Sequence, residues 1–193
     1  MGIRKAILSG WFTLVLGGSL MSGIGWAEMR DPPFPSYGSG PVEVRLFTDY
    51  FCSPCRDIEP EVEPILKELL KQNMIRLTLV DVPHDKLTPL YARNYLYAIK
   101  ENNDPEHSFR VRNILQGAAA GKDVKTQEQI EALFKEKGVA FSIWDTKPAF
   151  DRYNALIKED NIQGTPVCIV IKNGQKKFSM GKPNVIKAIK ALP

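Results

Sequence analysis

The sequence predicts an α/β protein with a mixed central sheet, assembled in the order β-α-β, a helical block, and then β-β-α. Three observations support this fold class. Residues 42–82 read as strand, helix, strand; residues 83–162 carry only helical signals; and Asn173-Gly174, a strong hairpin signal, lies between residues 167–171 and 176–180. A β-α-β crossover joins parallel strands and a hairpin joins antiparallel ones, so the sheet should be mixed.

The predicted β-α-β unit is indicated by a change in the spacing of apolar residues. Residues 42–47 alternate apolar and charged side chains, which predicts a strand with one buried face. From Ile58 to about Asn73 the apolar side chains recur at helical intervals instead. Residues 75–82, IRLTLVDV, are rich in aliphatic and β-branched side chains and predict the second strand.

The helical block and the C-terminal unit follow from capping and turn signals. An N-cap residue followed by proline, or a capping box, predicts where helices begin. These starts are Thr88-Pro89, Asp104-Pro105, Thr126 to Gln129 and Asp145-Thr146. Residues 167–171 and 176–180 then flank the hairpin turn, and an amphipathic helix covers residues 185–192.

The N-terminal residues 1–27 have the pattern of a secretory signal peptide. Arg4 and Lys5 precede an uncharged run, which ends in Gly25-Trp26-Ala27 with small residues at the two positions that a signal peptidase reads. Cleavage would leave a Pro/Gly-rich linker at 28–41 and a single domain at 42–193. An uncleaved membrane anchor is the alternative, because the uncharged run is long enough to span a bilayer.

Charge and cysteine count narrow the class of protein. The net charge of +4 falls to +2 without Arg4 and Lys5, which is too small to indicate a nucleic-acid or anionic-membrane partner. The chain has 3 cysteines, too few for a disulfide-stapled miniprotein. Export would place them where disulfides form and persist.

Two of these cysteines form the motif Cys52-Ser-Pro-Cys55, between the first strand and the helix. The first N–H groups of a helix lack partners and carry partial positive charge, which stabilises a thiolate. Such a position lowers a thiol pKa from about 8.5 toward 7. Cys55, one turn further in, suits a resolving thiol, and Arg56 adds positive charge nearby. This pattern favours a reversible dithiol.

Other uses of the two cysteines remain open at this point. A zinc site needs two more ligands, and only Cys168, His84, His107 and scattered carboxylates are available. A copper carrier could use both motif cysteines and one histidine. An inert structural disulfide between Cys52 and Cys55 would close a two-residue loop and constrain the unfolded chain very little.

A family resemblance strengthens the redox interpretation. The segment LFTDYFCSPC resembles the active site of thioredoxin-fold proteins of the bacterial periplasmic Dsb type. Gly164 to Val167, GTPV, resembles that fold's second signature, a loop whose proline is cis. The tail is similar to that of DsbC/DsbG isomerases and DsbA-like oxidases. The resemblance covers residues 42–82 and 162–192, with the helical block at about 84–161 as the family's insertion.

The resemblance implies a thioredoxin-like fold and a thiol-disulfide oxidoreductase that acts on protein thiols and disulfides. Cys52 would attack, and Cys55 would resolve the mixed disulfide. Thr165 and Pro166 would present backbone to an extended substrate. No cofactor or metal is implied, and a membrane redox partner would recycle the dithiol. The resemblance leaves open whether the protein oxidises, reduces or isomerises.

The sequence also departs from the family pattern. Leu46 stands six residues before the first cysteine, where thioredoxin and DsbA carry a buried acid. Ser-Pro replaces the Pro-His of DsbA, which predicts a less oxidising couple. The short linker leaves no room for the dimerisation domain of the DsbC-type isomerases. Pro60 matches the helix-kinking proline of many thioredoxin folds.

Four remaining residues have simpler interpretations. Cys168 lies in an apolar strand and is expected to be a buried, inert thiol. His84 and His107 are far from Cys52 in the sequence, and surface roles are expected for both. Phe51 either contributes to a peptide-binding surface or packs beneath the cysteines.

Overall fold

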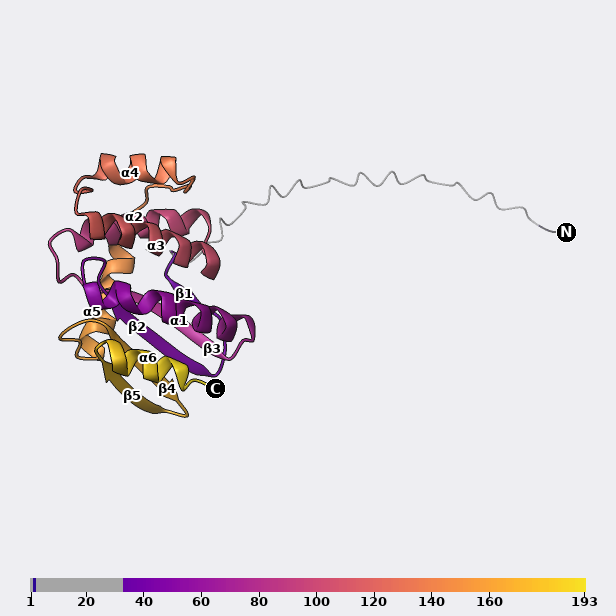
Figure 1. The fold of residues 1–193 in the computed structure, drawn as a ribbon. Helices are drawn as coiled ribbons and strands as arrows, with labels where there is room; N and C mark the ends of the chain where they lie inside the picture. The colour runs from indigo at the N-terminus through magenta and orange to yellow at the C-terminus, as the bar shows by residue number, and fades with distance from the viewer. Residues whose placement is uncertain (1, 3–32) are drawn as a thin grey trace. The chain divides into compact units, whose positions relative to one another are not determined.

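A computed structural model describes residue 2 and residues 33–193, and the predicted signal peptide 1–27 lies outside these residues except for residue 2 (Figure 1). The described chain forms a five-stranded sheet in the order β1-β3-β2-β4-β5. The strands are β1 (Ser36–Tyr37), β2 (Val42–Thr48), β3 (Ile75–Asp81), β4 (Val167–Lys172) and β5 (Gln175–Met180). Only β2 and β3 pair in parallel, so the sheet is mixed, as predicted.

The described residues form six helices in the predicted order, of which α4 packs on α2. They are α1 (Ser53–Lys71), α2 (Thr88–Glu101), α3 (Pro105–Gly121), α4 (Gln127–Glu136), α5 (Lys147–Glu159) and α6 (Lys182–Lys190). Helices α2 to α5 make up the predicted insertion between β3 and β4. In the described part of the chain no helix is both long and apolar enough to cross a membrane.

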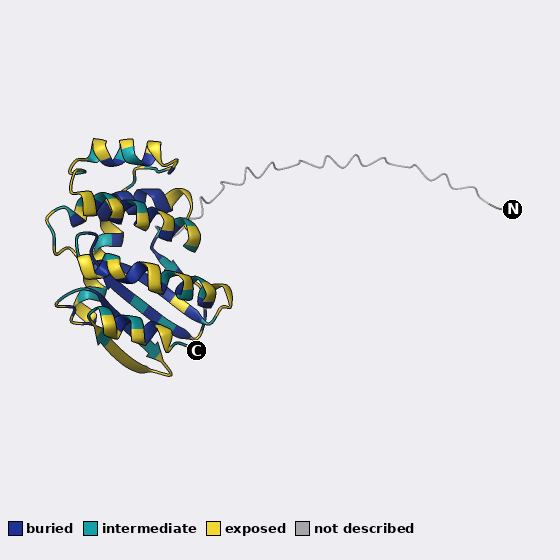
Figure 2. Cartoon of the chain, viewed as in Figure 1, coloured by how far each residue is buried: buried dark blue, intermediate teal, exposed yellow. Residues whose placement is uncertain are grey.

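The sheet has a hydrophobic core on each face. Successive side chains of a strand point to opposite faces, so Leu46 and Phe47 enter different cores. Leu46 packs with Ile58 of α1 and Val185 of α6, whereas Phe47 packs with residues of α2 to α5. The buried residues concentrate on the strands and on the helix faces turned toward them (Figure 2). Helix α1 is therefore held against the sheet, with its N-terminus at the carboxyl end of β2.

The last part of the predicted linker is folded. Phe34 is 8% exposed, and Ser36 pairs with Thr78 at the edge of β3 as part of β1. A Cβ atom at Gly40 would lie 2.2 Å from the backbone nitrogen of Ile75, so only glycine allows this close passage. The sequence pattern alone suggested that this Pro/Gly-rich segment was a linker. Its composition instead reflects the tight route along the sheet edge.

The capping predictions are confirmed at two helices and wrong at a third. Asp104 accepts a hydrogen bond from the backbone N–H of His107, and Thr126 forms the predicted capping box with Gln129. Helix α2, by contrast, has Leu87 at its cap and no side-chain capping bond. The hydroxyl of Thr88 instead bonds to a buried acid in the loop that carries the cysteines.

Candidate active site

The two motif cysteines lie where the sequence predicted. Cys52 is the N-cap residue of α1, with extended backbone angles, and its sulfur accepts a hydrogen bond from the backbone N–H of Cys55 at 3.3 Å. Cys52 is half-buried and Cys55 is fully buried. One sulfur is therefore accessible to a partner, and the other lies behind it.

This placement moves the two thiol pKa values in opposite directions. The side chain of Cys55, hydrogen-bonded to the Cys52 sulfur, is the largest influence and lowers the pKa of Cys52 from 9.0 to about 6. Thr165 and the backbone N–H of Cys55 add to this lowering, against partial burial. Burial raises the pKa of Cys55 above its ordinary range. At pH 7 these shifts favour the thiolate of Cys52 and the protonated thiol of Cys55.

The second signature directly precedes β4, and the pairing of β4 with β2 brings it beside the first signature. The Thr165–Pro166 peptide bond is cis, and the carbonyl oxygen of Thr165 lies 3.7 Å from the sulfur of Cys52. The carbonyl of Pro166 accepts a hydrogen bond from Gly181 at 2.9 Å, which holds the loop against the end of β5. The structure thus brings together Cys52, Cys55, Thr165 and Pro166, the residues that the sequence named as the site.

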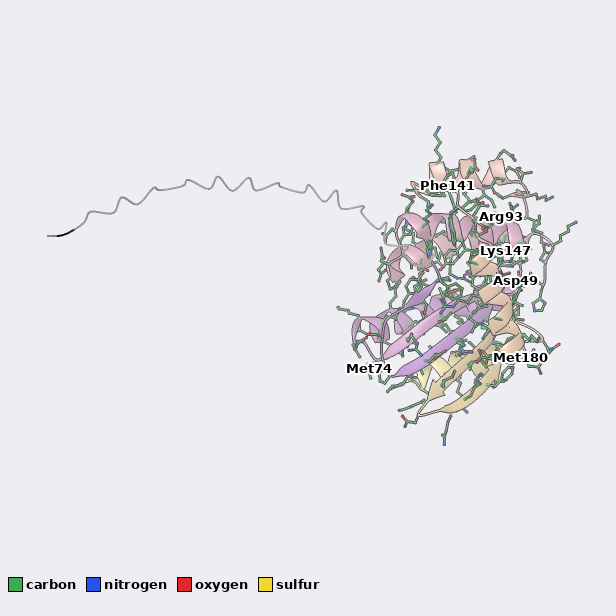
Figure 3. The ribbon with its side chains drawn as sticks, turned by 180° about the vertical axis from the view of Figure 1, so that it is seen from behind. Asp49, Met74, Arg93, Phe141, Lys147 and Met180 are labelled. Atoms are coloured by element: carbon green, nitrogen blue, oxygen red, sulfur yellow. The ribbon has the colours of Figure 1, made fainter. Side chains whose placement is uncertain are left out.

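A buried acid that the sequence analysis did not single out anchors the cysteine loop. Asp49 is 1% exposed and lies at the carboxyl end of β2, whereas Met74 marks the opposite end of the sheet (Figure 3). Its carboxylate accepts hydrogen bonds from four donors. They are the backbone N–H groups of Phe51 (2.6 Å), His84 (3.0 Å) and Asp85 (3.2 Å) and the hydroxyl of Thr88 (2.7 Å). The sequence signal that could have identified Asp49 is an acid directly after a predicted strand and three residues before the first cysteine.

His84 lies closer to the cysteines than its sequence position indicated. It lines a pocket of about 230 Å³ together with Asp49, Phe51, Cys52 and Asp85. Because β2 and β3 are parallel neighbours, their carboxyl ends meet at the same edge of the sheet, which brings the residues after β3 beside those after β2. His84 is itself exposed, in keeping with the expected surface role, although the fold places it beside Cys52.

Packing distinguishes between the roles expected for Phe51 and Cys168. Phe51 packs its ring against that of Tyr91, with centroids 4.9 Å apart and an edge-on geometry, and its exposed part lines the pocket beside Cys52. Cys168 lies in β4 opposite Leu46 and is fully buried, which raises its pKa to about 12. Cys168 is thus buried, as the sequence predicted. Within residues 33–193 no three His, Cys, Asp or Glu side chains form a metal-binding group.

A buried charged cluster lies behind the cysteine loop. Arg112 of α3 is 1% exposed, and its guanidinium donates to Asp81 at 2.8 Å and to the hydroxyl of Thr48 at 2.6 Å. It also lies over the ring of Tyr50, 5.2 Å from the centroid. The hydroxyl of Tyr50 donates to Asp81 at 3.0 Å. The cluster joins α3 to the ends of β2 and β3, next to the loop that begins at Asp49.

The sequence profile of the thioredoxin family matches residues 38–190. The chain belongs to the thioredoxin family. A comparison with curated protein sequences gave no match.

Solved structures of thioredoxin-fold proteins share this architecture. A periplasmic thioredoxin-like protein from Salmonella enterica serovar Typhimurium superposes with a TM-score of 0.59 at 20% identity, covering 83% of this chain and 90% of that one. Wolbachia pipientis alpha-DsbA1 gives 0.63 at 13% identity, covering 84% and 92%. The catalytic domain of Proteus mirabilis ScsC gives 0.59 at 19% identity, covering 84% and 90%. The fold is therefore that of the Dsb-type thioredoxin proteins.

Proposed function

We propose that this protein is an exported thiol-disulfide oxidoreductase that exchanges disulfides with protein thiols through Cys52 and Cys55. The supporting observation is the accessible sulfur of Cys52 with a pKa of about 6 beside a buried, protonated Cys55. A thiolate is the attacking species in disulfide exchange, and a neighbouring thiol releases the product. Neither step needs a metal or a cofactor.

The exchange proceeds in two balanced steps. In the reducing direction, the Cys52 thiolate attacks one sulfur of a substrate disulfide, and the other substrate sulfur leaves as a thiolate. Cys55 then loses its proton and attacks the Cys52 sulfur of the mixed disulfide. The Cys52–Cys55 disulfide forms, and the second substrate sulfur leaves. The oxidising direction is the reverse of these two steps.

The loop at Thr165 and Pro166 supports a protein substrate. Thr165 is part-exposed, and its carbonyl lies 3.7 Å from the attacking sulfur. An extended peptide that lies along this loop would bring its own sulfur within reach of Cys52. The proteins named DsbA and ScsC among the structural neighbours are consistent with this use of the fold.

Export is the second part of the proposal. Residues 1–27 have the signal-peptide pattern, and the similar Salmonella protein is described as periplasmic. A membrane redox partner would then recycle the dithiol. Mass spectrometry of the secreted protein should find Glu28 as its first residue. An uncleaved anchor would instead keep the full chain in the membrane fraction.

Trapping the mixed disulfide tests the activity. C55S should accumulate a Cys52 adduct with a disulfide-containing peptide, C52S should form none, and C168S should turn over like the wild type. Absence of the adduct in C55S would refute the proposed activity.

The redox equilibrium of the Cys52–Cys55 couple with glutathione should give a reduction potential more negative than the value of about −120 mV for DsbA.

A copper-carrying module is the second candidate, because His84 lines the same pocket as Cys52. Titration of the reduced protein with Cu(I) distinguishes the two functions. Tight binding that is lost in both C52S and H84A, together with a Cys52 pKa near its ordinary value, would favour the carrier.

A further inference from the structure

The outer strand of the sheet, β5, has one edge that pairs with no other strand among the described residues. β5 stands at the end of the order β1-β3-β2-β4-β5. It is exposed along nearly its whole length, with only Ser179 half-buried (Figure 2). A free strand edge presents backbone N–H and C=O groups that can bind an extended segment of another chain. The free edge of β5 is therefore a candidate interaction surface.

The turn before β5 determines which backbone groups face outward. Asn173 and Gly174 have positive φ angles of 52° and 77°, which are typical of the two-residue type I′ turn. The residues that flank such a turn, here Lys172 and Gln175, exchange backbone hydrogen bonds, and bonded and non-bonded pairs then alternate. In the non-bonded pairs, the N–H and C=O groups of β5 point away from β4. The residues of β5 in these pairs are Lys176, Phe178 and Met180.

The side chains of β5 divide between the two faces of the sheet. Phe178 and Met180 lie on one face and are 50% and 46% exposed, which is unusual for large apolar side chains in this chain. Lys177 lies on the other face, where β5 and α6 form a groove of about 480 Å³. Lys187 of α6 also lines the groove, and no described Asp or Glu does. The edge therefore has an apolar side and a positively charged side.

The charge in this groove lacks a counterpart within the described part of the chain. Lys177 and Lys187 are both exposed, and neither forms an ion pair within residues 33–193. Lys176, on the opposite face, instead forms ion pairs with Glu159 and Asp160 of the same chain. Carboxylates of a partner would complement the two lysines in the groove.

The edge fits a peptide strand better than other occupants. A second copy of this chain would bring its own lysine-rich β5 to the edge, and like charges across a strand pair are unfavourable. A membrane surface would supply no backbone groups to pair with the outward N–H and C=O groups of β5. Successive side chains of a strand point to opposite faces, so a matching strand is acidic and apolar at alternate positions.

We propose that the free edge of β5 is a docking site for an extended segment of a partner protein in which acidic and apolar side chains alternate. The segment adds a strand to the sheet. Its carboxylates lie beside Lys177 and Lys187, and its apolar side chains pack on Phe178 and Met180. The docking itself does not use the cysteines.

The docking site ends beside the candidate active site. A Cβ atom added at Gly164 would come within 2.7 Å of the methyl group of Met180, so the end of β5 packs against the loop before Pro166. Gly181, which follows Met180, donates to the carbonyl of Pro166. A partner on β5 is therefore held next to the loop that contacts Cys52.

A labelled peptide tests the docking and its charge pattern. A fluorescent peptide of alternating Glu and Val should bind in anisotropy titrations at low salt, and a peptide with the same residues in two blocks should not. K177E/K187E should weaken binding by about tenfold, because two charge pairs become repulsive. R93E/K100E, at exposed positions on α2, changes the net charge equally and should bind like the wild type. Equal binding of the alternating and block peptides would overturn the inference.

Methylation of the peptide backbone separates strand pairing from attraction between charges. Two further peptides carry N-methyl groups on every Val or on every Glu, which removes the donors along one edge of the strand. Against the wild-type protein, one of them should bind at least about tenfold more weakly, because several hydrogen bonds are lost. Loss in the Val-methylated peptide indicates an antiparallel strand, and loss in the Glu-methylated peptide a parallel one. Unchanged binding of both would overturn the inference.

The other occupants are tested in the same way. Sedimentation of the protein alone should show no dimer that F178E dissociates, and phosphatidylglycerol vesicles should not compete with the peptide. A dimer of that kind, or competition by vesicles, would assign the edge to a second copy or to a membrane and overturn the inference. Peptide binding should persist in C52S, which distinguishes a failure of the docking from a failure of the proposed exchange activity.

Discussion

At the scale of single residues, Cys52 and Cys55 differ in reactivity because their surroundings differ. Cys52 caps a helix, is part-exposed and accepts a hydrogen bond from the backbone of Cys55. Cys55 lies three residues further along and is fully buried. The free helix N–H groups and the donated bond stabilise a thiolate at Cys52, whereas burial penalises one at Cys55. The proposed division of labour between an attacking and a resolving thiol follows from this difference.

The first prediction concerns the ionisation of Cys52. Its alkylation rate with iodoacetamide should rise with pH around a midpoint of about 6, because the thiolate is the reacting form. C55A should move this midpoint toward 9.0, since the side chain of Cys55 is the main cause of the lowering. Peptide mapping by mass spectrometry would assign the label. A wild-type midpoint close to 9 would contradict the interpretation.

The second prediction concerns Cys168, the third thiol. It is fully buried in β4, and its pKa is raised to about 12. At pH 8 the folded, reduced protein should therefore label at Cys52 and leave Cys168 unmodified, whereas labelling in denaturant should reach both. Labelling of Cys168 in the folded protein at a rate similar to that of Cys52 would show that β4 opens.

At the scale of elements, Asp49 ties two loops together at the carboxyl end of the sheet. It binds its own loop through Phe51 and the segment after β3 through His84, Asp85 and Thr88. The backbone N–H of Cys52 in turn donates to the Asp49 carbonyl at 3.2 Å. The start of α1, and hence the position of the attacking sulfur, depends on this one side chain.

The third prediction is that D49A destabilises the protein by about 3 kcal/mol, because several buried donors lose a charged acceptor. The variant should also react more slowly at Cys52, since the loop that positions the sulfur would loosen. Urea unfolding and the adduct-forming rate measure the two effects. D57A, which removes an exposed acid in the first turns of α1, is the matched control and should change neither by much.

At the scale of the whole molecule, the Arg112 cluster joins the insertion to the thioredoxin core. Its guanidinium lies on α3 and bonds to the ends of β2 and β3, and Glu59 brings in α1. Removing one partner from a buried ion pair leaves an uncompensated charge, which costs about 3–5 kcal/mol. The cluster therefore couples the stability of the helical insertion to that of the active-site region.

The fourth prediction follows from this coupling. R112M should lower the free energy of unfolding by about 3–5 kcal/mol, because Asp81 and Glu59 would lose their common cation. R110M, at an exposed position on the same helix, should cost little. Denaturant unfolding measured by circular dichroism compares them. A loss in R112M no larger than in R110M would contradict the role given to the cluster.

The sequence determined the order of the elements and named the residues of the candidate site. Alternation and helical period fixed the order of strands and helices, and the two signatures identified Cys52, Cys55, Thr165 and Pro166. These signals are local, because each depends on neighbours within one strand, one helix or one turn. For the same reason the capping role given to Thr88 was wrong: its hydroxyl bonds to Asp49, a residue that is close only after folding.

Only the tertiary structure decided what lies around and beneath the dithiol. Pairing of β2 with β3 brought His84 beside Cys52, and packing of α3 on α1 buried Arg112 against Glu59. No sequence pattern indicated either contact, because a buried charged residue looks the same as an exposed one until its partners are known. Contacts between residues far apart in the sequence determine the burial and the partners of each ionisable group, and these determine its pKa.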